Sequence, residues 1–210
     1  MGLVVAADGG ATRALALGCR PNLVVGDGDS LGPDGLARLR SAGITLELAP
    51  VAKDESDTEL AAVEAIRRGA TRLTVLGALG GPRLDHALAN VWLLAHPVLA
   101  DRETVILDAR TRVRLLSAPA TSGGVAALTG PPAEAILVGR PGDLVTLLPF
   151  GQDALGITTA GLAFPLDGEP LRVGPARGLS NLRTGPEARV SLRSGRLLVI
   201  ETRNDEGGST

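Results

Sequence analysis

Short apolar runs alternate with longer segments of helical periodicity through the first half of the chain. The apolar runs predict strands at 3–6, 23–25, 44–48, 73–76 and 104–107, and the periodic segments predict helices at 11–17, 33–42, 58–68 and 85–95. Strands that alternate with helices at this spacing are typical of α/β proteins. We therefore expect a mostly parallel sheet flanked by helices, and we place this α/β domain at residues 1–120.

The second half of the chain has a different pattern. Residues 117–132 are rich in Ala, Gly, Pro, Ser and Thr, which suits a linker or an irregular crossover. The apolar runs beyond them are short and often alternate with polar residues, which predicts a small all-β domain over 121–210. Its strands are expected at 142–149, 156–159, 171–173, 188–193 and 196–200, with Ser194-Gly195 as a hairpin turn before the last strand and a polar tail from 205.

Composition and charge exclude several classes of partner. The chain has 210 residues and a formal net charge of −2, so it offers no basic surface for nucleic acid or for anionic lipid. No apolar run approaches the roughly 20 residues of a membrane helix. The opening Met1-Gly2-Leu3 does not resemble a secretion signal, so we expect a cytoplasmic protein.

Two apolar features are expected to lie in the core. The single cysteine, Cys19, is expected to be a small buried apolar residue. Leu84, Leu88 and Trp92 recur at helical spacing in the segment 85–95 and its first flank, and we interpret this stripe as a core face. His96, which precedes a proline, is expected at the end of that helix.

The stretch Val24–Ser30 carries the most informative polar pattern. Two apolar residues suited to a buried strand lead into Asp27 and Asp29, with glycine before and between them. If the segment is extended, the two carboxylates point the same way, about 7 Å apart. Like charges so close favour a bound cation, and hard oxygen ligands suit Mg²⁺. The alternative is an Asp/Gly-rich turn without a ligand.

Polar residues also follow the other predicted strands of the first half. The carboxyl edge of an open α/β sheet is where such proteins bind ligands, so their shared position argues for one site. For Asp57 an alternative stays open, because Ser56-x-x-Glu59 fits a capping box and an acid is favoured in the first turn of a helix. The residues expected at this edge are Asp8, Asp27, Asp29, Asp57, Arg83 and Asp85.

The glycine-rich segment Gly77–Arg83 precedes the last predicted helix of the first half. Its spacing matches neither the Rossmann nor the P-loop motif, and it could be a plain tight loop. Glycines ahead of a helix nevertheless allow backbone N–H groups to approach a phosphate, and Arg83 adds a fork-shaped donor. His86, on the helix, is more often a solvated residue than a catalytic one.

Several stretches, taken in chain order, resemble thiamine pyrophosphokinase. The C-terminal pair Gly161-Leu162 and Ser180-Asn181 resembles the family's second domain, so the likeness spans nearly the whole chain. The stretches that carry the resemblance in the first half are Ala7-Asp8-Gly9-Gly10-Ala11, Gly26-Asp27-Gly28-Asp29-Ser30, Lys53-Asp54-Glu55-Ser56-Asp57 and Gly80–Asn90.

The resemblance implies a fold and a reaction. It implies an α/β catalytic domain that binds ATP and Mg²⁺, followed by a β-sandwich that binds thiamine, in a homodimer with its sites at the subunit interface. The implied reaction transfers pyrophosphate from ATP to the hydroxyl of thiamine and gives thiamine diphosphate and AMP. Gly28 between the two aspartates and Pro82 before Arg83 depart from the family's pattern.

Residue roles follow from matching the family's motifs and from the charges. Asp27, Asp29 and Asp57 are expected to hold Mg²⁺, and together with Arg83 and Asp85 they form the expected catalytic set. Asp85 either orients Arg83 or accepts the hydroxyl proton. Ser180 and Asn181 are expected to contact thiamine. The residues expected to bind ATP are Asp8, Gly9, Gly10, Ser30, Lys53, Gly80, Gly81 and His86.

Two other functions stay open at this point. One is a related pyrophosphokinase that acts on another alcohol, such as a hydroxymethylpterin, with the same metal site. The other is a nucleotide- or thiamine-binding module without catalysis, which the short segment before Asp8 and the departure at Pro82 would favour.

Overall fold

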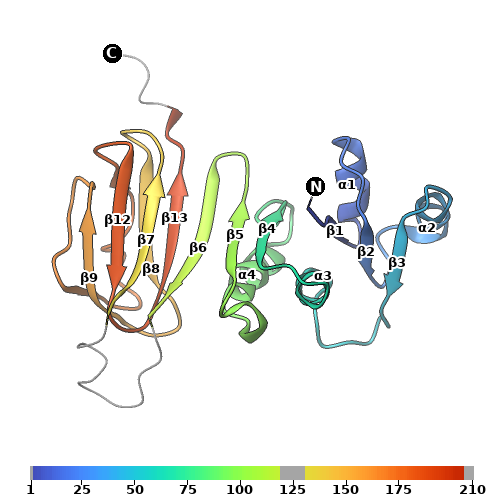
Figure 1. Cartoon of the computed structure of the whole chain (residues 1–210), viewed down its shortest axis with the longest axis horizontal. Helices are drawn as coiled ribbons and strands as arrows, with labels where there is room; N and C mark the ends of the chain where they lie inside the picture. Colours follow the sequence, from blue (N-terminus) through green and yellow to red (C-terminus); the bar gives the residue numbers. More distant parts are fainter. Residues whose placement is uncertain (1, 119–130, 206–210) are drawn as a thin grey trace. The chain divides into compact units, whose positions relative to one another are not determined.

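The structure, a computed structural model, describes residues 2–118 and 131–205. The chain divides into two units. The first comprises Met1–Leu73 with Gly77–Glu103, and the second comprises Thr74–Leu76 with Thr104–Thr210. Figure 1 shows the element order along the chain. Among the described residues, none of the helices reaches the length and apolarity that a membrane span requires.

The first unit is built on a three-stranded parallel sheet in the order β1-β2-β3. Alternate residues of the central strand face opposite sides, as the pleat dictates. Val24 packs with Ala11 of α1 and Leu39 of α2, whereas Leu23 and Val25 pack with Ala61 of α3. The elements are β1 (Val5–Ala7), α1 (Gly10–Ala16), β2 (Leu23–Gly26), α2 (Gly32–Ser41), β3 (Thr45–Leu48) and α3 (Asp57–Arg67).

The first unit continues with α4 (Leu84–Leu93) and the short 3₁₀ helix η1 (Pro97–Leu99). Leu93 of α4 and Leu99 of η1 pack with Ala62 of α3, which joins these elements to the rest of the unit. His96 caps η1, because its Nδ1 accepts a hydrogen bond from the Val98 N–H at 3.2 Å. The expectation of a helix-end residue at His96 is therefore confirmed.

The mostly parallel sheet is confirmed for β1–β3 only. The next strands, β4 (Arg72–Leu76) and β5 (Glu103–Leu107), belong instead to a six-stranded sheet in the order β11-β8-β13-β6-β5-β4. A tight hairpin after β5 joins that strand to the six-stranded sheet. The Asp108 N–H donates to the Thr111 carbonyl at 2.8 Å, and β6 (Thr111–Ser117) returns antiparallel to β5. Apolar runs identify strands, but they do not specify which strands pair.

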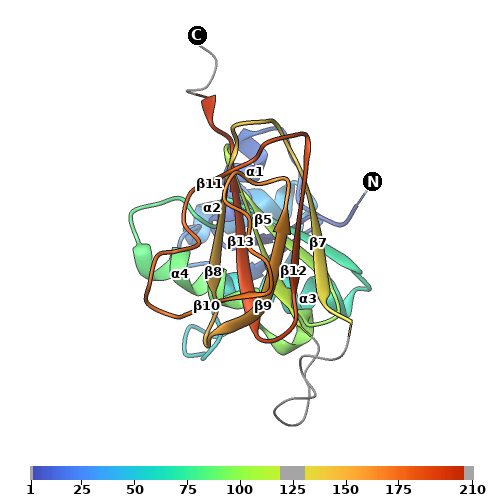
Figure 2. The same cartoon turned by 90° about the vertical axis from the view of Figure 1, so that its left-hand side faces the viewer.

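The second unit contains a sandwich of that six-stranded sheet and a four-stranded sheet in the order β10-β9-β12-β7 (Figure 2). Side chains from both sheets form one apolar core, which includes Leu137, Leu147, Ile157, Leu192 and Val199. The expected C-terminal β-rich domain is thus present. Its remaining strands are β7 (Ala133–Val138), β8 (Leu144–Pro149), β9 (Ala154–Ala160), β10 (Glu169–Leu171), β11 (Asn181–Leu182), β12 (Glu187–Leu192) and β13 (Arg196–Thr202).

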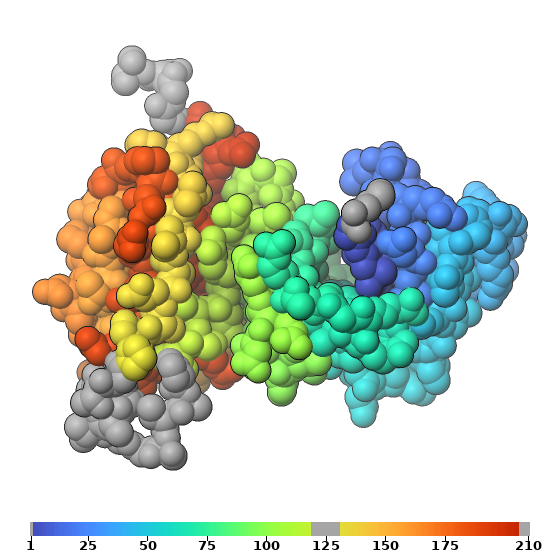
Figure 3. Space-filling model, viewed as in Figure 1, coloured from blue at the N-terminus to red at the C-terminus, as the bar shows by residue number. Residues whose placement is uncertain are grey.

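The connection at Ser194-Gly195 differs from the expected hairpin. Strand β12 pairs with β7 and β9, whereas β13 pairs with β6 and β8, so this turn carries the chain from one sheet to the other. Strands β6, β7 and β11 were not expected from the pattern. Strand β7 is an edge strand and lies open on the surface (Figure 3). Most of the expected linker at 117–132 and the end of the polar tail lie outside the described residues.

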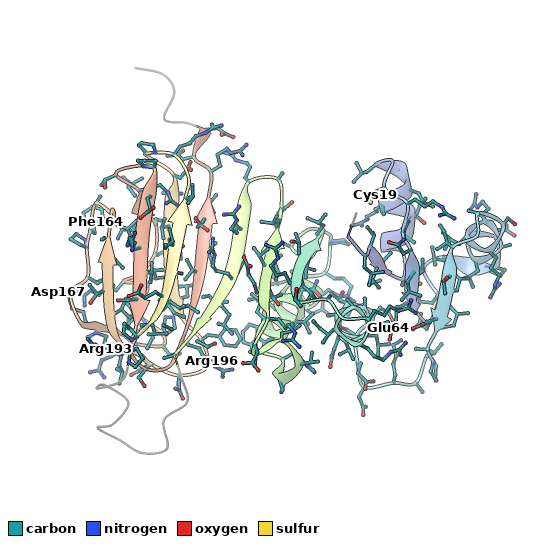
Figure 4. The ribbon with its side chains drawn as sticks, in the orientation of Figure 1. Cys19, Glu64, Phe164, Asp167, Arg193 and Arg196 are labelled. Atoms are coloured by element: carbon teal, nitrogen blue, oxygen red, sulfur yellow. The ribbon has the colours of Figure 1, made fainter. Side chains whose placement is uncertain are left out.

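Two expected core features prove to be on the surface. Cys19, labelled in Figure 4, is exposed in the loop after α1. Trp92 is 60% exposed and Leu84 is 72% exposed, so the apolar stripe of α4 faces solvent in this single chain. Helical periodicity correctly predicts one apolar face, but it does not show whether another part of the same chain covers that face.

Candidate active site

Three carboxylates from separate parts of the first unit meet at one point. A carboxylate oxygen from each of Asp8, Asp27 and Asp57 lies within 4.8 Å of the others, and we refer to these residues as the acidic cluster. Asp8 directly follows β1, Asp27 directly follows β2, and Asp57 is the first residue of α3. The cluster therefore lies at the carboxyl edge of the parallel sheet, where the sequence places a ligand site.

Asp8 is held in a strained and buried position. Its φ of 38° lies in the left-handed region, which costs a non-glycine residue free energy. The Asp8 N–H donates to the Val25 carbonyl at 2.8 Å, and its Oδ2 accepts from the Ser30 N–H at 3.2 Å. Its Oδ1 is buried and has no hydrogen-bond partner among the described residues. A buried carboxylate oxygen without a partner is costly unless a ligand satisfies it.

Gly26 makes room for the cluster. Its φ is 151°, and a Cβ added there would lie 2.9 Å from Cβ of Asp8 and 3.1 Å from Cγ of Asp57. The end of β2 thus passes so close to two members of the acidic cluster that only a residue without a side chain fits.

Lys53 supplies the positive charge that the acidic cluster needs. Its Nζ lies 2.9 Å from Oδ2 of Asp27 and 3.1 Å from Oδ1 of Asp57. The hydrogen bond that Lys53 donates to Asp27 raises the pKa of Lys53, and the same contact, helped by the Asp29 N–H, lowers the pKa of Asp27. At neutral pH the ammonium and the Asp27 carboxylate are therefore both charged.

Asp29 lies outside the acidic cluster. The segment after β2 is a turn rather than an extended strand, and the Asp29 N–H donates to Oδ1 of Asp27 at 3.1 Å. The alternation on which the two carboxylates were expected to face the same way therefore does not apply. Asp29 is exposed, and its Oδ1 accepts from Oγ of Ser30 at 3.1 Å. Its role as a metal ligand stays a prediction.

Ser56 and the loop around Gly9 complete this edge. Oγ of Ser56 accepts from the Glu59 N–H at 3.1 Å, so the predicted N-cap of α3 is confirmed. Because Asp57 is also in the acidic cluster, the capping and the site interpretations both hold for this segment. Gly9 and Gly10 begin α1 next to Asp8, and a Cβ on Gly9 would lie 3.1 Å from Cβ of Ser30.

Arg83 and Asp85 form an exposed fork at the start of α4. Nε of Arg83 donates to Oδ1 of Asp85 at 3.2 Å, and its Nη2 donates to Oδ2. This pairing raises the pKa of Arg83 and lowers the pKa of Asp85. Gly80, Gly81 and His86 are all exposed beside this pair.

Asn90 fixes the glycine-rich loop before α4. Its Nδ2 donates to the Ala78 carbonyl at 2.9 Å, which joins the loop to the helix that follows it. Sequence analysis includes Asn90 in a family-like motif but gives it no role. Its spacing of four residues, about one helical turn, from His86 is the signal that could have suggested one.

Ser180 and Asn181 lie in the second unit. Ser180 has a φ of 56°, and its N–H donates to Oγ1 of Thr146 at 2.9 Å. Asn181 brackets the backbone of Phe164: its Oδ1 accepts from the Phe164 N–H at 3.0 Å, and its Nδ2 donates to the Phe164 carbonyl at 2.6 Å. Phe164 itself is 69% exposed, so this bracket presents an aromatic ring to solvent.

The donor set of the acidic cluster suits a divalent cation that prefers oxygen. Ligand oxygens around Mg²⁺ lie up to about 4.2 Å apart, from metal–oxygen distances of about 2.1 Å. The oxygens of the acidic cluster lie within 4.8 Å of one another, so all three are close enough to converge on one ion. The unpartnered Oδ1 of Asp8 is the observation that most favours such an ion.

Comparisons with known proteins match this arrangement to one family. A model of the thiamin pyrophosphokinase catalytic domain matches residues 1–107, and a model of the thiamin pyrophosphokinase vitamin B1 binding domain matches residues 136–197. The chain is 24% identical over 201 residues to thiamine pyrophosphokinase of Bacillus subtilis, covering 95% of this chain and 87% of that protein.

Solved structures give the same result for the fold. The crystal structure of thiamine pyrophosphokinase from Bacillus subtilis is similar with a TM-score of 0.80 at 23% identity, covering 96% of this chain and 88% of that one. The thiamin pyrophosphokinase from Geobacillus thermodenitrificans has a TM-score of 0.78 at 26% identity, covering 97% and 87%.

Proposed function

Since the chain belongs to the thiamin pyrophosphokinase family, we propose that the acidic cluster and its surrounding loops carry out that family's reaction. In this reaction the pyrophosphate group of ATP passes to the hydroxyl of thiamine, which gives thiamine diphosphate and AMP. The observation that carries the proposal is the meeting of Asp8, Asp27 and Asp57 at the carboxyl edge of a parallel sheet.

The same observations favour this function over the two alternatives. The match of residues 136–197 to a vitamin B1 binding domain supports thiamine as the acceptor rather than a hydroxymethylpterin. A binding module without catalysis would have no need of three clustered carboxylates, one of them the strained and buried Asp8, which cost folding free energy.

We assign the divalent cation, Mg²⁺, to Asp8, Asp27 and Asp57, with Asp29 close enough in sequence to contribute through a bound water. When bound, such an ion neutralises charge on the phosphate oxygens of ATP as the pyrophosphate group transfers. The carboxylates of the acidic cluster hold and orient it. Ser30 maintains Asp8 in place through its N–H.

The residues that we propose to contact ATP are Gly9, Gly10, Ser30, Lys53, Gly80, Gly81, Arg83 and His86. Lys53 is shared between Asp27 and Asp57. When a cation binds these two carboxylates, the Lys53 ammonium is placed to pair with phosphate oxygens of ATP instead. Arg83 offers a planar fork for phosphate oxygens. Of the two roles left open for Asp85, orientation of Arg83 is favoured, because its lowered pKa makes it a poor base.

Thiamine is proposed to bind at Ser180, Asn181 and Phe164. A thiazolium cation is attracted to the face of an aromatic ring. Phe150 is buried and stacks under Arg196, with the guanidinium carbon 5.3 Å from the ring centroid, whereas Phe164 is exposed. The bracket made by Asn181 fixes the backbone of Phe164 and therefore the position of its ring.

The remaining assignments are of domains, assembly and compartment. Residues 1–120 are assigned to the ATP- and Mg²⁺-binding domain and residues 121–210 to the thiamine-binding sandwich, which the matches at 1–107 and 136–197 support. A cytoplasmic homodimer with sites at the subunit interface is proposed. The exposed stripe of Leu84, Leu88 and Trp92 supports it, because an apolar face of this kind is usually covered by a partner.

Release of AMP from ATP and Mg²⁺, with and without thiamine, tests the proposal. Wild-type protein should form AMP only when thiamine is present, and Asp27→Asn should abolish most of this activity while the melting temperature stays close to that of the wild type. Formation of AMP without thiamine would point to another acceptor. Near-normal turnover by Asp27→Asn would remove the metal assignment.

A further inference from the structure

The second unit contains an open cavity of about 280 Å³ that the proposed reaction does not use. The β5–β6 hairpin, the β7–β8 connection and the end of β13 line it. Neither Ser180 nor Asn181 is among its lining residues. Five arginines are among its lining residues, namely Arg110, Arg112, Arg140, Arg183 and Arg203.

A buried ion network forms one wall of the cavity. Arg183 is only 2% exposed, and its Nη2 lies 2.7 Å from Oε2 of the buried Glu201. Arg114 donates to the other oxygen, Oε1, at 2.6 Å. Both oxygens of Glu201 are therefore occupied by arginines. Nε of Arg183 is buried and has no hydrogen-bond partner among the described residues.

The remaining carboxylates of the cavity are occupied by other donors. Asp143 accepts from the backbone N–H groups of Arg140 and Asn204, at 2.8 and 3.2 Å. Asp108 accepts from the Ala109 N–H at 2.8 Å. Among the residues that the structure describes, neither carboxylate is paired with a guanidinium, and both accept hydrogen bonds from backbone N–H groups instead.

Two guanidinium groups of the cavity have no anionic partner among the described residues, and a third is only loosely paired. Within the described ranges, the side chains of Arg140 and Arg203 make no hydrogen bond or ion pair, and Nη1 of Arg112 comes no nearer than 3.8 Å to Glu201. Arg110, in contrast, pairs with Asp205 at 3.2 Å. The lining carries five arginines against the three acids Asp108, Asp143 and Glu201, so the cavity is net positive.

We propose that this cavity is a binding site for a phosphate or diphosphate group. Arginine forks match the oxygens of phosphate, and several of them converge on this one cavity. The volume accommodates a group of this size with its first waters. The same charge excludes cationic thiamine from this cavity, so the site is separate in chemistry from the proposed thiamine contacts.

Isothermal titration calorimetry on the full chain tests the proposal. The probes are inorganic phosphate, inorganic diphosphate and phenyl phosphate, in the presence of a chelator so that no divalent cation assists binding. The variant is Arg140→Ser with Arg203→Ser, whose side chains have no partner to lose among the described residues. The matched control is Arg189→Ser, an exposed arginine of β12 that pairs with Glu187 outside the cavity.

Wild-type protein and the control should bind phosphate or diphosphate with the same affinity, and the double variant should bind at least tenfold more weakly. If phenyl phosphate binds as tightly as inorganic phosphate, the site takes the phosphate end of a larger metabolite. If phenyl phosphate does not bind, the site takes the free anion. Equal binding by the double variant and the wild type, or no binding by the wild type, would overturn the proposal. Thiamine-dependent AMP release, measured on the same protein preparations with Mg²⁺ in place of the chelator, reports on the proposed function separately.

Discussion

Substitution of Gly26 by alanine should damage both the stability of the first unit and the acidic cluster. The φ of 151° is unfavourable for a residue with a side chain, at a cost of about 1–3 kcal/mol. The new Cβ would lie 2.9 Å from Cβ of Asp8, closer than such atoms normally approach, so a shift of about another 1–3 kcal/mol must follow. The free energy of unfolding should therefore fall by about 2–6 kcal/mol.

Calorimetry and AMP release measure these two effects. Each kcal/mol lowers the melting temperature of a domain of this size by roughly 4–8 °C, so Gly26→Ala should melt at least about 8 °C below the wild type. The added methyl also pushes Asp8 and Asp57 apart, so thiamine-dependent AMP release should fall at least tenfold at a temperature where the variant is folded.

Gly185→Ala is the matched control, because its Cβ would meet nothing within 4 Å and no positive φ constrains it. Its melting temperature and activity should stay at the wild-type values. A Gly26→Ala variant with the wild-type melting temperature and the wild-type rate of AMP release would refute the reasoning. The close approach of Gly26 to Asp8 and Asp57 would then be incorrect.

Three further predictions follow from individual contacts. Lys53→Met removes the ammonium between Asp27 and Asp57, so ATP turnover should fall about 10²-fold while calorimetric titration shows unchanged or tighter Mn²⁺ binding. Weaker Mn²⁺ binding would contradict the role of Lys53 as the cation that these two carboxylates share. Asn181→Ala frees the backbone of Phe164, so the KM for thiamine should rise while the KM for ATP is unchanged; an unchanged thiamine KM would remove this bracket from the site. Arg67 and Arg68 lower the pKa of Glu64 from 4.5 to about 2, so Glu64→Gln should lower the free energy of unfolding by about 1–2 kcal/mol above pH 4.5, a value reduced by the exposure of Arg67. The difference from wild type should shrink as the pH falls toward 2, and a difference in urea unfolding that does not change with pH would contradict the ion pair.

The strands and helices of the first half could be predicted because each is a local pattern. The meeting of Asp8 and Asp27 at the carboxyl edge could also be predicted, since β1 and β2 are parallel and end at the same edge. The pairing of β4 and β5 could not, because an apolar run looks the same whether its neighbour is parallel or antiparallel. The turn at Ser194-Gly195 shows the same limit, since a short Gly-containing turn serves a hairpin and a passage between sheets equally well.

The make-up of the acidic cluster depended on backbone geometry that sequence does not give. The sequence motif assigns Asp8 to ATP, whereas its carboxylate lies in the acidic cluster and its backbone adopts a positive φ that sequence does not reveal. Asp29 was placed beside Asp27 on the assumption of an extended segment, but the Asp29 N–H closes a turn onto Asp27 instead. The exposure of Trp92 was missed because amphipathicity alone does not distinguish a face buried within one chain from a face left for a second chain.

The Mn²⁺ dependence of thiamine-dependent AMP release tests the central claim most directly, in the wild type, in Asp8→Asn and in Asp34→Asn. Asp34 is an exposed acid in the first turn of α2 and serves as the control. Wild type and Asp34→Asn should saturate at the same Mn²⁺ concentration, and Asp8→Asn should need at least tenfold more or release no AMP. Asp8→Asn with the wild-type Mn²⁺ dependence would contradict the assignment of the acidic cluster as the metal site.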